Sequence, residues 1–223
     1  MFKKTIAILI LLTLFLSTSV TQAKISVGVK VGDWIEYHIS TTGNPIPGHD
    51  ITWARMEIID VQGTAIKANV TSLSDNGTLS TITRNFNLKE GQLQAWVIIP
   101  ANLGTGNTFY DSSTGSNITI QGEEQQSLAG ATRTITHVNT PEKDKQWDKA
   151  TGVFVTTMDY LQNYTVNATA TATNMWSPQI FGLDQALFFS IIGGISVIMI
   201  TVAVSTILFT RKKKKALKII QTA

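Results

Sequence analysis

Three histidines and a few neighbouring acids are the residues of this 223-residue chain that could carry out chemistry. The histidines (His38, His49 and His137) do not form the short pairs, at i, i+2 or i, i+4, that mark many metal sites. Pairs of acids could act as general acid and base, and the candidates are Glu123, Glu124, Glu142 and Asp144. Adjacent acids on a strand or turn usually face water, and no nucleophile elbow, phosphate loop or dinucleotide fingerprint occurs. The sequence therefore predicts a protein that is not an enzyme and that uses no metal or other cofactor.

Three further polar residues fall in phase with apolar ones. In residues 81–88 Arg84 shares the parity of the apolar side chains, and in residues 131–138 Arg133 and His137 do so. A charge on an apolar face is costly unless it has a partner or a ligand. We therefore take these three as tentative ligand-facing residues on the concave side of a sheet. The alternative is a bulge or a sheet edge that returns them to solvent.

The positive charge of the chain is concentrated at its ends. Lys and Arg number 18 against 15 Asp and Glu, a net charge of +3, yet residues 24–180 hold 10 basic and 14 acidic residues. An acidic body lacks the electrostatic footprint of a nucleic-acid-binding protein. The chain has no cysteine, which excludes disulfides, thiol nucleophiles and cysteine-ligated metal sites.

Residues 1–23 have the form of a secretory signal peptide. Lys3 and Lys4 precede sixteen uncharged, mostly apolar residues, and small residues lead to a cleavage position after Ala23. The alternative is an uncleaved anchor, because sixteen residues with some neighbours could span a thin bilayer. In both cases residue 24 onward is predicted to lie outside the cell.

Residues 186–210 are predicted to form a transmembrane helix. They carry no charge, and as a helix they would be roughly 37 Å long, which exceeds a hydrocarbon core of about 30 Å. The five cations from Arg211 to Lys215 place the polybasic tail, residues 211–223, in the cytoplasm, where they would also contact anionic membrane lipid. We therefore expect a single-pass protein of the cell membrane with its N-terminal domain outside.

Two smaller features flank this segment. Residues 178–185 form a short juxtamembrane junction, with Trp176 just before them as an aromatic residue suited to the membrane interface. Ser190, Gly193 and Gly194 form a small-residue pattern that would let two such helices pack closely as a homodimer. The alternative is glycine of the kind that is ordinary in transmembrane helices.

Residues 24–177 are predicted to form an extracellular, all-β domain of mainly antiparallel sheet, built as a curved half-barrel or a sandwich. The segment is rich in Thr, Val and Ile, it shows short stretches of period-two alternation, and it contains no clear amphipathic helix. Asp75-Asn76-Gly77 predicts a tight hairpin, and Asp148 to Gly152 a longer hairpin loop. We expect about eight to ten strands, in or near residues 33–40, 53–61, 64–71, 78–88, 93–99, 117–121, 131–138 and 153–173.

Five Asn-x-Thr triplets make the domain a candidate glycoprotein. Their spacing places the acceptors in a turn or opposite the apolar face of predicted strands, where a glycan would be accommodated. The alternative is that polar strand faces are rich in Asn and Thr. The candidate acceptors are Asn69, Asn76, Asn117, Asn163 and Asn167.

The chain resembles a group of uncharacterised archaeal single-pass surface proteins. The likeness rests on three stretches: Val31-Gly32-Asp33-Trp34-Ile35-Glu36-Tyr37, Ile98 to Leu103, and Trp147-Asp148-Lys149-Ala150-Thr151-Gly152-Val153. The last is also similar to a hairpin of half-barrel carriers like the bacterial lipoprotein carriers. These resemblances imply a curved antiparallel sheet at a microbial cell surface, and they bring no catalytic residues.

The sequence thus favours a membrane-anchored extracellular module that binds or displays an unknown ligand or protein. A first alternative is a half-barrel that carries or senses a lipid-like ligand between its concave face and the membrane, which requires a sizeable apolar cavity. A second alternative is a surface-anchored hydrolase, which requires acids that converge in a cleft.

Overall fold

The computed structural model describes residues 25–46 and 50–220, and side chains as far as residue 210. The predicted signal peptide lies outside these residues, as do the side chains of the polybasic run. The elements are β1 (Trp34–Gly43), β2 (Ile51–Gln62), β3 (Ala65–Ser74), β4 (Leu79–Asn87), β5 (Thr108–Asp111), β6 (Ser116–Thr119), β7 (Gly122–Leu128), β8 (Ala131–Asn139), β9 (Lys143–Asp148), β10 (Phe154–Tyr160), β11 (Tyr164–Thr173), β12 (Gln179–Ile180), β13 (Leu183–Asp184) and α2 (Gln185–Ile220).

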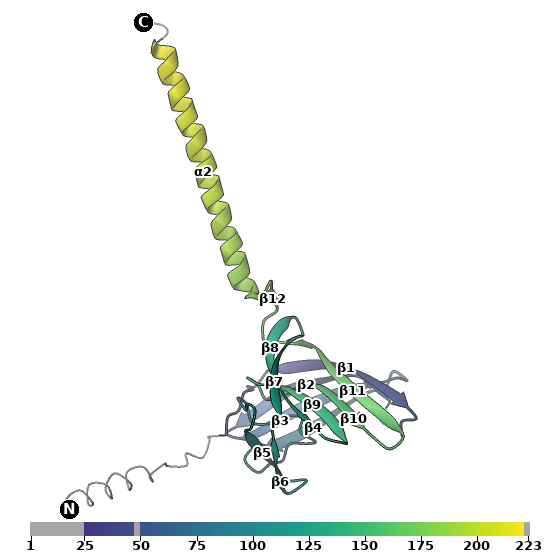
Figure 1. Ribbon diagram of the computed structural model, residues 1–223. Coiled ribbons are helices and arrows are strands. Elements are labelled where there is room, and N and C mark those ends of the chain that lie inside the picture. The colour runs from purple at the N-terminus through teal and green to yellow at the C-terminus, as the bar shows by residue number, and fades with distance from the viewer. Residues whose placement is uncertain (1–24, 47–49, 221–223) are drawn as a thin grey trace, which may run out of the picture.

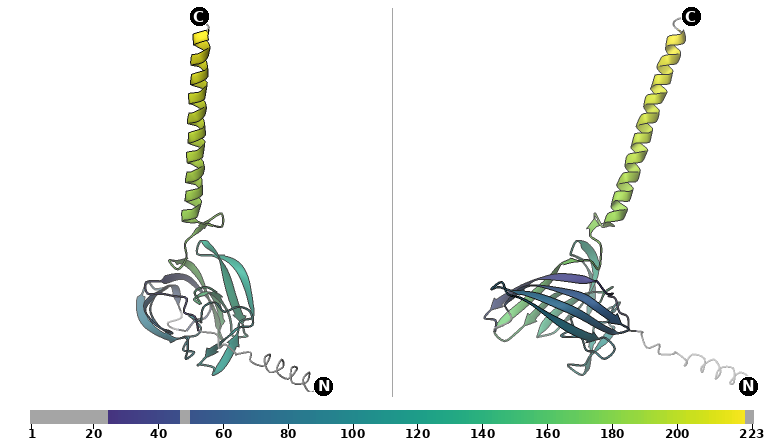
Figure 2. Two further views of the ribbon diagram at one scale, coloured as in Figure 1. Left: turned by 90° about the vertical axis from the view of Figure 1, so that its left-hand side faces the viewer. Right: turned by 180° about the vertical axis from the view of Figure 1, so that it is seen from behind.

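Nine strands form a single antiparallel sheet in the order β4-β3-β2-β1-β11-β10-β9-β8-β7. The sheet curves around a shared interior, and α2 extends away from it (Figures 1 and 2). The predicted class, mainly antiparallel β-sheet with one apolar helix, is confirmed. Because the large sheet is single and curved, the architecture is the half-barrel rather than the sandwich.

Two meanders build this sheet. Strands β1 to β4 pair in sequence order, β7 to β11 do the same, and the pairing of β1 with β11 joins the two halves. The predicted hairpin at Asp75-Asn76-Gly77 closes β3 and β4, with Gly77 at a φ of 82°. This leaves β4 and β7 as the two edges of the sheet, and the chain must pass from one edge to the other.

Residues 88–121 make that passage. Part of this stretch, residues 93–101, packs against the concave face of the sheet, and we call it the interior segment. Residues 88–121 also contain the small hairpin β5–β6, and their apolar side chains Leu93, Ile98 and Ile99 are almost fully buried. The interior segment therefore covers part of the concave face of the sheet. It fills part of the interior and leaves part of it open.

The strand predicted over residues 93–99 is wrong. The segment forms turns, and Ile98 makes an isolated bridge to Val153. Gln94, Ala95 and Trp96 have left-handed φ angles of 48°, 59° and 65°. Such angles cost roughly 1–2 kcal/mol per residue for non-glycine residues, so surrounding contacts must hold them.

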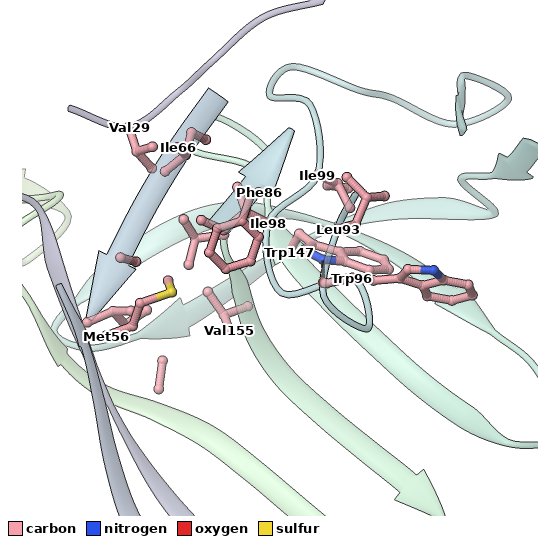
Figure 3. Close-up of a cluster of buried hydrophobic side chains, with 14 of the residues drawn as sticks. Val29, Met56, Ile66, Phe86, Leu93, Trp96, Ile98, Ile99, Trp147 and Val155 are labelled. Carbon is pink, nitrogen blue, oxygen red and sulfur yellow. Dashed lines mark hydrogen bonds between the residues drawn. The ribbon is translucent and has the colours of Figure 1, made fainter. Parts of the chain in front are cut away.

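An aromatic cluster of Trp96, Phe109 and Trp147 supplies those contacts, and Figure 3 shows the two tryptophans among the buried side chains of the core. The rings of Trp96 and Phe109 lie 5.8 Å apart edge to face, and both pack against Trp147, at 6.3 and 6.0 Å. The indole N–H of Trp147 donates to the carbonyl oxygen of Trp96 at 2.8 Å, and that of Trp96 donates to the carboxylate of Asp111 at 2.9 Å. The buried polar groups of both tryptophans are therefore satisfied.

The β9–β10 hairpin explains the stretch from Trp147 to Gly152. Asp148 is fully buried and accepts hydrogen bonds from the backbone N–H and hydroxyl of Thr151, both at 2.9 Å. Gly152 has a φ of 71°, and a Cβ there would lie 2.2 Å from the carbonyl oxygen of Ile99. Asp148, Thr151 and Gly152 therefore have structural roles, in hydrogen bonding and in backbone conformation.

The junction between the sheet and α2 is the short hairpin β12–β13. Trp176, expected at the membrane interface, is buried instead, with the guanidinium of Arg133 4.9 Å from its ring centre. The aromatic residue exposed here is Phe181, at 90% of its surface. Asp184 caps the helix by accepting from the N–H of Ala186 at 2.9 Å.

The helix α2 is long and apolar enough to cross a membrane over Gln185–Thr210, the one such helix in the described part of the chain. Five of its hydroxyl groups are satisfied within the helix, because Ser190, Ser196, Thr201, Thr206 and Thr210 each donate to the carbonyl oxygen four residues earlier. These five side chains therefore do not oppose burial in lipid. The homodimer through Ser190, Gly193 and Gly194 stays a prediction.

Candidate functional site

An apolar cleft of about 460 Å³ lies on the inner face of the sheet beside the interior segment. Its size falls within the range of about 300–1,000 Å³ that is usual for small-molecule sites. The lining residues come from β1 to β4, the interior segment and β10: Tyr37, Ile39, Ile51, Ala54, Met56, Val70, Ser72, Ile82, Arg84, Phe86, Gln94, Ala95, Val97 and Phe154.

The strand register explains why these side chains share one wall. Met56 pairs with Val70, and Val70 pairs with Ile82, so these three apolar side chains form a row across β2, β3 and β4. Paired residues of antiparallel strands point to the same face. The alternation of the sequence therefore creates a continuous apolar surface.

The cleft has a closed floor and an open mouth. At the floor, Tyr37 and Met56 are 2% and 3% exposed, and Tyr37 stacks on Phe154 with ring centres 4.2 Å apart. The Tyr37 hydroxyl donates to the carbonyl oxygen of Phe154 at 2.9 Å, and burial raises the pKa of this phenol well above 10. Ile82 is 44% exposed and Arg84 is also exposed, so the mouth lies towards the edge strand β4.

The turn of Gln94, Ala95 and Trp96 forms the opposite wall of the cleft. The side-chain amide of Gln94 donates to the carbonyl oxygen of Asn85 on β4 at 3.1 Å, which ties this turn to the edge of the sheet. On the other side, the ammonium of Lys145 donates to the carbonyl oxygen of Ala95 at 2.7 Å. The turn thus bridges β4 and β9, and these two bonds help to hold its left-handed backbone.

Lys145 is a buried cation directly behind this wall. It is 3% exposed, and its ammonium lies 4.9 Å from the centre of the Phe154 ring. Burial lowers the pKa of Lys145 to about 8, while the charge of Asp159 raises it and that of Lys143 lowers it further. The groups that touch Lys145, Ala95 and Phe154, both line the cleft.

Arg84 is the one charged residue among the cleft-lining residues. It lies on β4 opposite Ala68, in phase with Ile82 and Phe86, as its parity in the sequence predicted. Its guanidinium makes no ion pair or side-chain hydrogen bond with the described residues. The cleft therefore combines an apolar interior with an unpaired cation at its mouth.

The other two residues proposed to face a ligand are placed elsewhere. Arg133 forms a bidentate ion pair with Asp148, at 2.8 and 3.1 Å, and so has an internal partner. His137 is half-buried opposite Gly122 on β7. Six strands separate β8, which carries both, from β4 in the sheet, so the structure does not bring them to Arg84.

The acids considered for hydrolysis are distributed over separate places. Glu123 pairs with Lys149 and accepts from the N–H of Thr105, and the Lys149 hydrogen bond lowers the pKa of this carboxyl. Glu124, its neighbour on β7, is exposed, and β8 separates both from Glu142 and Asp144. Among the described residues no group of three or more His, Asp and Glu could hold a metal ion.

The five sequon asparagines differ in exposure. Asn76, Asn117 and Asn163 are exposed, whereas Asn69 and Asn167 are half-buried. The side-chain oxygen of Asn69 accepts from the hydroxyl of Thr83 at 2.8 Å. Of the five, the three exposed positions offer the most room for a glycan.

Comparisons with known proteins do not show the family to which the chain belongs. No protein-family model and no curated protein matches the chain. A solved structure described as "The Siderocalin Ex-FABP functions through dual ligand specificities" aligns with 63% of this chain and 70% of that chain, at 10% identity and a TM-score of 0.24. A TM-score that low supports no conclusion about function, which must come from the cleft itself.

Proposed function

We propose that the protein binds an apolar or amphiphilic small molecule in the inner cleft and holds it close to a membrane. The observation that carries this proposal is the cleft of about 460 Å³, in which ten of the fourteen lining residues are aliphatic, Met or Phe. An exposed apolar surface of this kind is unfavourable in water unless a ligand covers it. This corresponds to the carrier or sensor alternative of the sequence analysis.

The chain's helix supports a membrane-bound setting for this activity. Asp184 caps α2 immediately after the β12–β13 hairpin, so residues 174–184 alone separate the nine-stranded sheet from the apolar helix. A ligand that partitions into lipid would therefore be concentrated near the cleft. We further propose that the domain lies outside the cell, as the signal-peptide pattern and Arg211 to Lys215 indicate, at the surface of a microbial cell.

The sequence favoured a module that binds an unknown ligand or protein, and this proposal specifies a small-molecule ligand. A protein partner would need a broad surface, whereas the structure offers a concave apolar cleft of small-molecule size. We also propose that the protein is not an enzyme. Glu123, whose pKa is lowered chiefly by its hydrogen bond with Lys149, is already engaged in an ion pair with that residue.

Filling the cleft is expected to abolish ligand binding. The full-length chain would be placed in phosphatidylcholine nanodiscs that contain a photoreactive single-chain amphiphile, and labelled peptides would be mapped by mass spectrometry. Labelling is expected in residues 65–87 and 94–97 of the unmodified protein. Val70→Trp places an indole in the middle row of the cleft wall, and we expect at least tenfold less labelling of these segments.

The matched control is Lys67→Trp, on the outer face of the same strand, where the side chain is exposed. It should leave labelling of the cleft unchanged. Ser72→Phe provides a second filling variant in case Val70→Trp does not fold, which the near-ultraviolet circular dichroism of the tryptophans would reveal. Absence of cleft labelling in the unmodified protein would refute the proposed function.

Glycosylation is a separate prediction on the exposed sequons. If Asn76 is modified in a host that glycosylates Asn-x-Thr, then Thr78→Ala should lower the intact mass by one glycan beyond the substitution itself. The asparagine remains, as does the backbone bond from Ser74 N–H to the carbonyl oxygen of residue 78. Thr81→Ala, outside any sequon, should leave the glycan mass unchanged, and equal masses of glycan in all three proteins would contradict modification at Asn76.

A further inference from the structure

We infer that the ligand of the cleft is an amphiphile with a single anionic head, such as a carboxylate or a phosphate, bound by Arg84 while its apolar tail lies inward. This rests on the proposed function and adds the chemical class of the ligand. It follows from three features of the cleft: its charge, its polarity gradient and the geometry of β4.

The charge of the lining is entirely positive. Arg84 is the one ionised residue among the fourteen that line the cleft, and no carboxylate is among them. The guanidinium has no anionic partner within the described residues, unlike Arg55 and Arg133, which pair with Glu36 and Asp148. An arginine of this kind presents a planar set of donors that matches the oxygens of a carboxylate or phosphate.

The polarity of the cleft changes from mouth to floor. Towards the mouth lie Arg84 and Gln94, both exposed, whereas the floor is formed by Tyr37, Met56 and Phe154. The single polar group of the floor, the Tyr37 hydroxyl, already donates to a carbonyl oxygen. A ligand tail meets no unsatisfied polar group there, and its head meets a cation at the entrance.

The register of the strands places Arg84 next to the apolar row of the cleft wall. Arg84 is one alternation step from Ile82 on β4, and Ile82 begins the row that continues through Val70 to Met56. Arg84 and Ile82 are therefore neighbours on the same face of the edge strand β4. A head bound by Arg84 therefore has the apolar row directly beside it, so that one molecule can contact both.

The same nanodisc experiment can distinguish the contribution of the ligand's head to binding from that of its tail. Two probes are compared at equal mole fraction and at pH 8: a diazirine-bearing hexadecanoic acid and the alcohol with the same chain. We expect the acid to label residues 65–87 and 94–97 about five- to tenfold more than the alcohol. Arg84→Gln should remove this preference by lowering labelling with the acid, while labelling with the alcohol stays constant.

Two further variants test whether position as well as charge matters. Lys67→Gln removes one positive charge from the outer face of the neighbouring strand, beside the rung that carries Arg84, and should leave both probes unaffected. Arg84→Lys keeps the charge and should keep part of the preference for the acid.

Equal labelling by acid and alcohol in the unmodified protein would overturn the anionic head but not the apolar cleft. An acid preference that survives Arg84→Gln would overturn the role of Arg84. If neither probe labels the cleft, both this inference and the proposed function are wrong. The three results are distinct, so a failure of the ligand class is not confused with a failure of binding.

Discussion

Asp148→Ala is expected to lower the free energy of unfolding by about 3–5 kcal/mol, the largest effect we expect from a single substitution in this protein. The carboxylate is buried and joins three groups: the guanidinium of Arg133, and the N–H and hydroxyl of Thr151. Without it, the mostly buried cation of Arg133 loses its anionic partner and the hairpin loop loses two hydrogen bonds. Urea denaturation of the full-length chain in detergent, followed by tryptophan fluorescence, would measure the change.

Asp144→Ala is the matched control, because Asp144 lies on the same strand and its side chain makes no hydrogen bond or ion pair within the described residues. It should cost less than about 1 kcal/mol, as is usual at such positions. The double variant Arg133→Met with Asp148→Asn removes both charges and should lose less stability than Asp148→Ala alone. A loss below 1 kcal/mol for Asp148→Ala would show that the ion pair and the loop bonds are unimportant.

The part of the fold that alternation describes was predictable from the sequence. Ile35, Tyr37 and Ile39 recur at every second position of β1, and all three contribute to the core or pack against it. Asn76 and Gly77 indicate a turn because both residue types are common in turns, and Gly77 takes a φ of 82° that few other residues accept. Both signals are local, since they depend on neighbours within a few positions.

The interior segment could not be predicted in this way. Residues 93–99 are apolar enough to suggest a strand, but Gln94 to Trp96 take left-handed angles that no local signal indicates. The carbonyl oxygens of Ala95 and Trp96 accept hydrogen bonds from Lys145 and Trp147, about fifty residues further along the chain. A contact over that separation leaves no periodic trace in the sequence.

The alternation of apolar and polar residues does not predict the edge strand β7, for a different reason. Its side chains from Glu123 to Gln125 are all exposed, so the strand shows no alternation of apolar and polar residues. Polar and charged residues of this kind protect the edges of sheets from pairing with other chains. The feature that makes β7 a safe edge therefore also hides it from a search for amphipathic strands.

The candidate site was predictable only in its charged part. The parity of Arg84 with Ile82 and Phe86 indicates a cation on an apolar face, and the structure places it at the mouth of the cleft. The same reasoning placed Arg133 in that group, but Asp148, fifteen residues away, takes up its charge. Parity shows the face on which a side chain lies, whereas the partner on that face depends on tertiary structure.

Lys145, which lies behind the wall of the cleft, should make the stability of the protein depend on pH. In the unfolded chain its pKa is about 10.5, and burial lowers it to about 8 in the folded protein. Between these values the unfolded state binds more protons than the folded state, so the stability of the protein rises as pH increases. We expect the free energy of unfolding to increase by about 2–3 kcal/mol from pH 7 to pH 10 through this group. Above pH 10 the buried Tyr37 opposes the rise, because its raised pKa makes the unfolded chain ionise first.

Lys145→Met should remove this rise and leave a much flatter profile between pH 7 and pH 10, while Lys67→Met, at an exposed position, should keep it. The variant loses the hydrogen bond to the carbonyl oxygen of Ala95, but at pH 7 it also avoids burying a charge, so the two effects offset each other there. At pH 10 the native lysine is already neutral and still donates to Ala95, so the variant should be clearly the less stable protein. The two stability profiles should therefore diverge with pH, and parallel profiles would contradict a buried, titrating lysine behind the cleft.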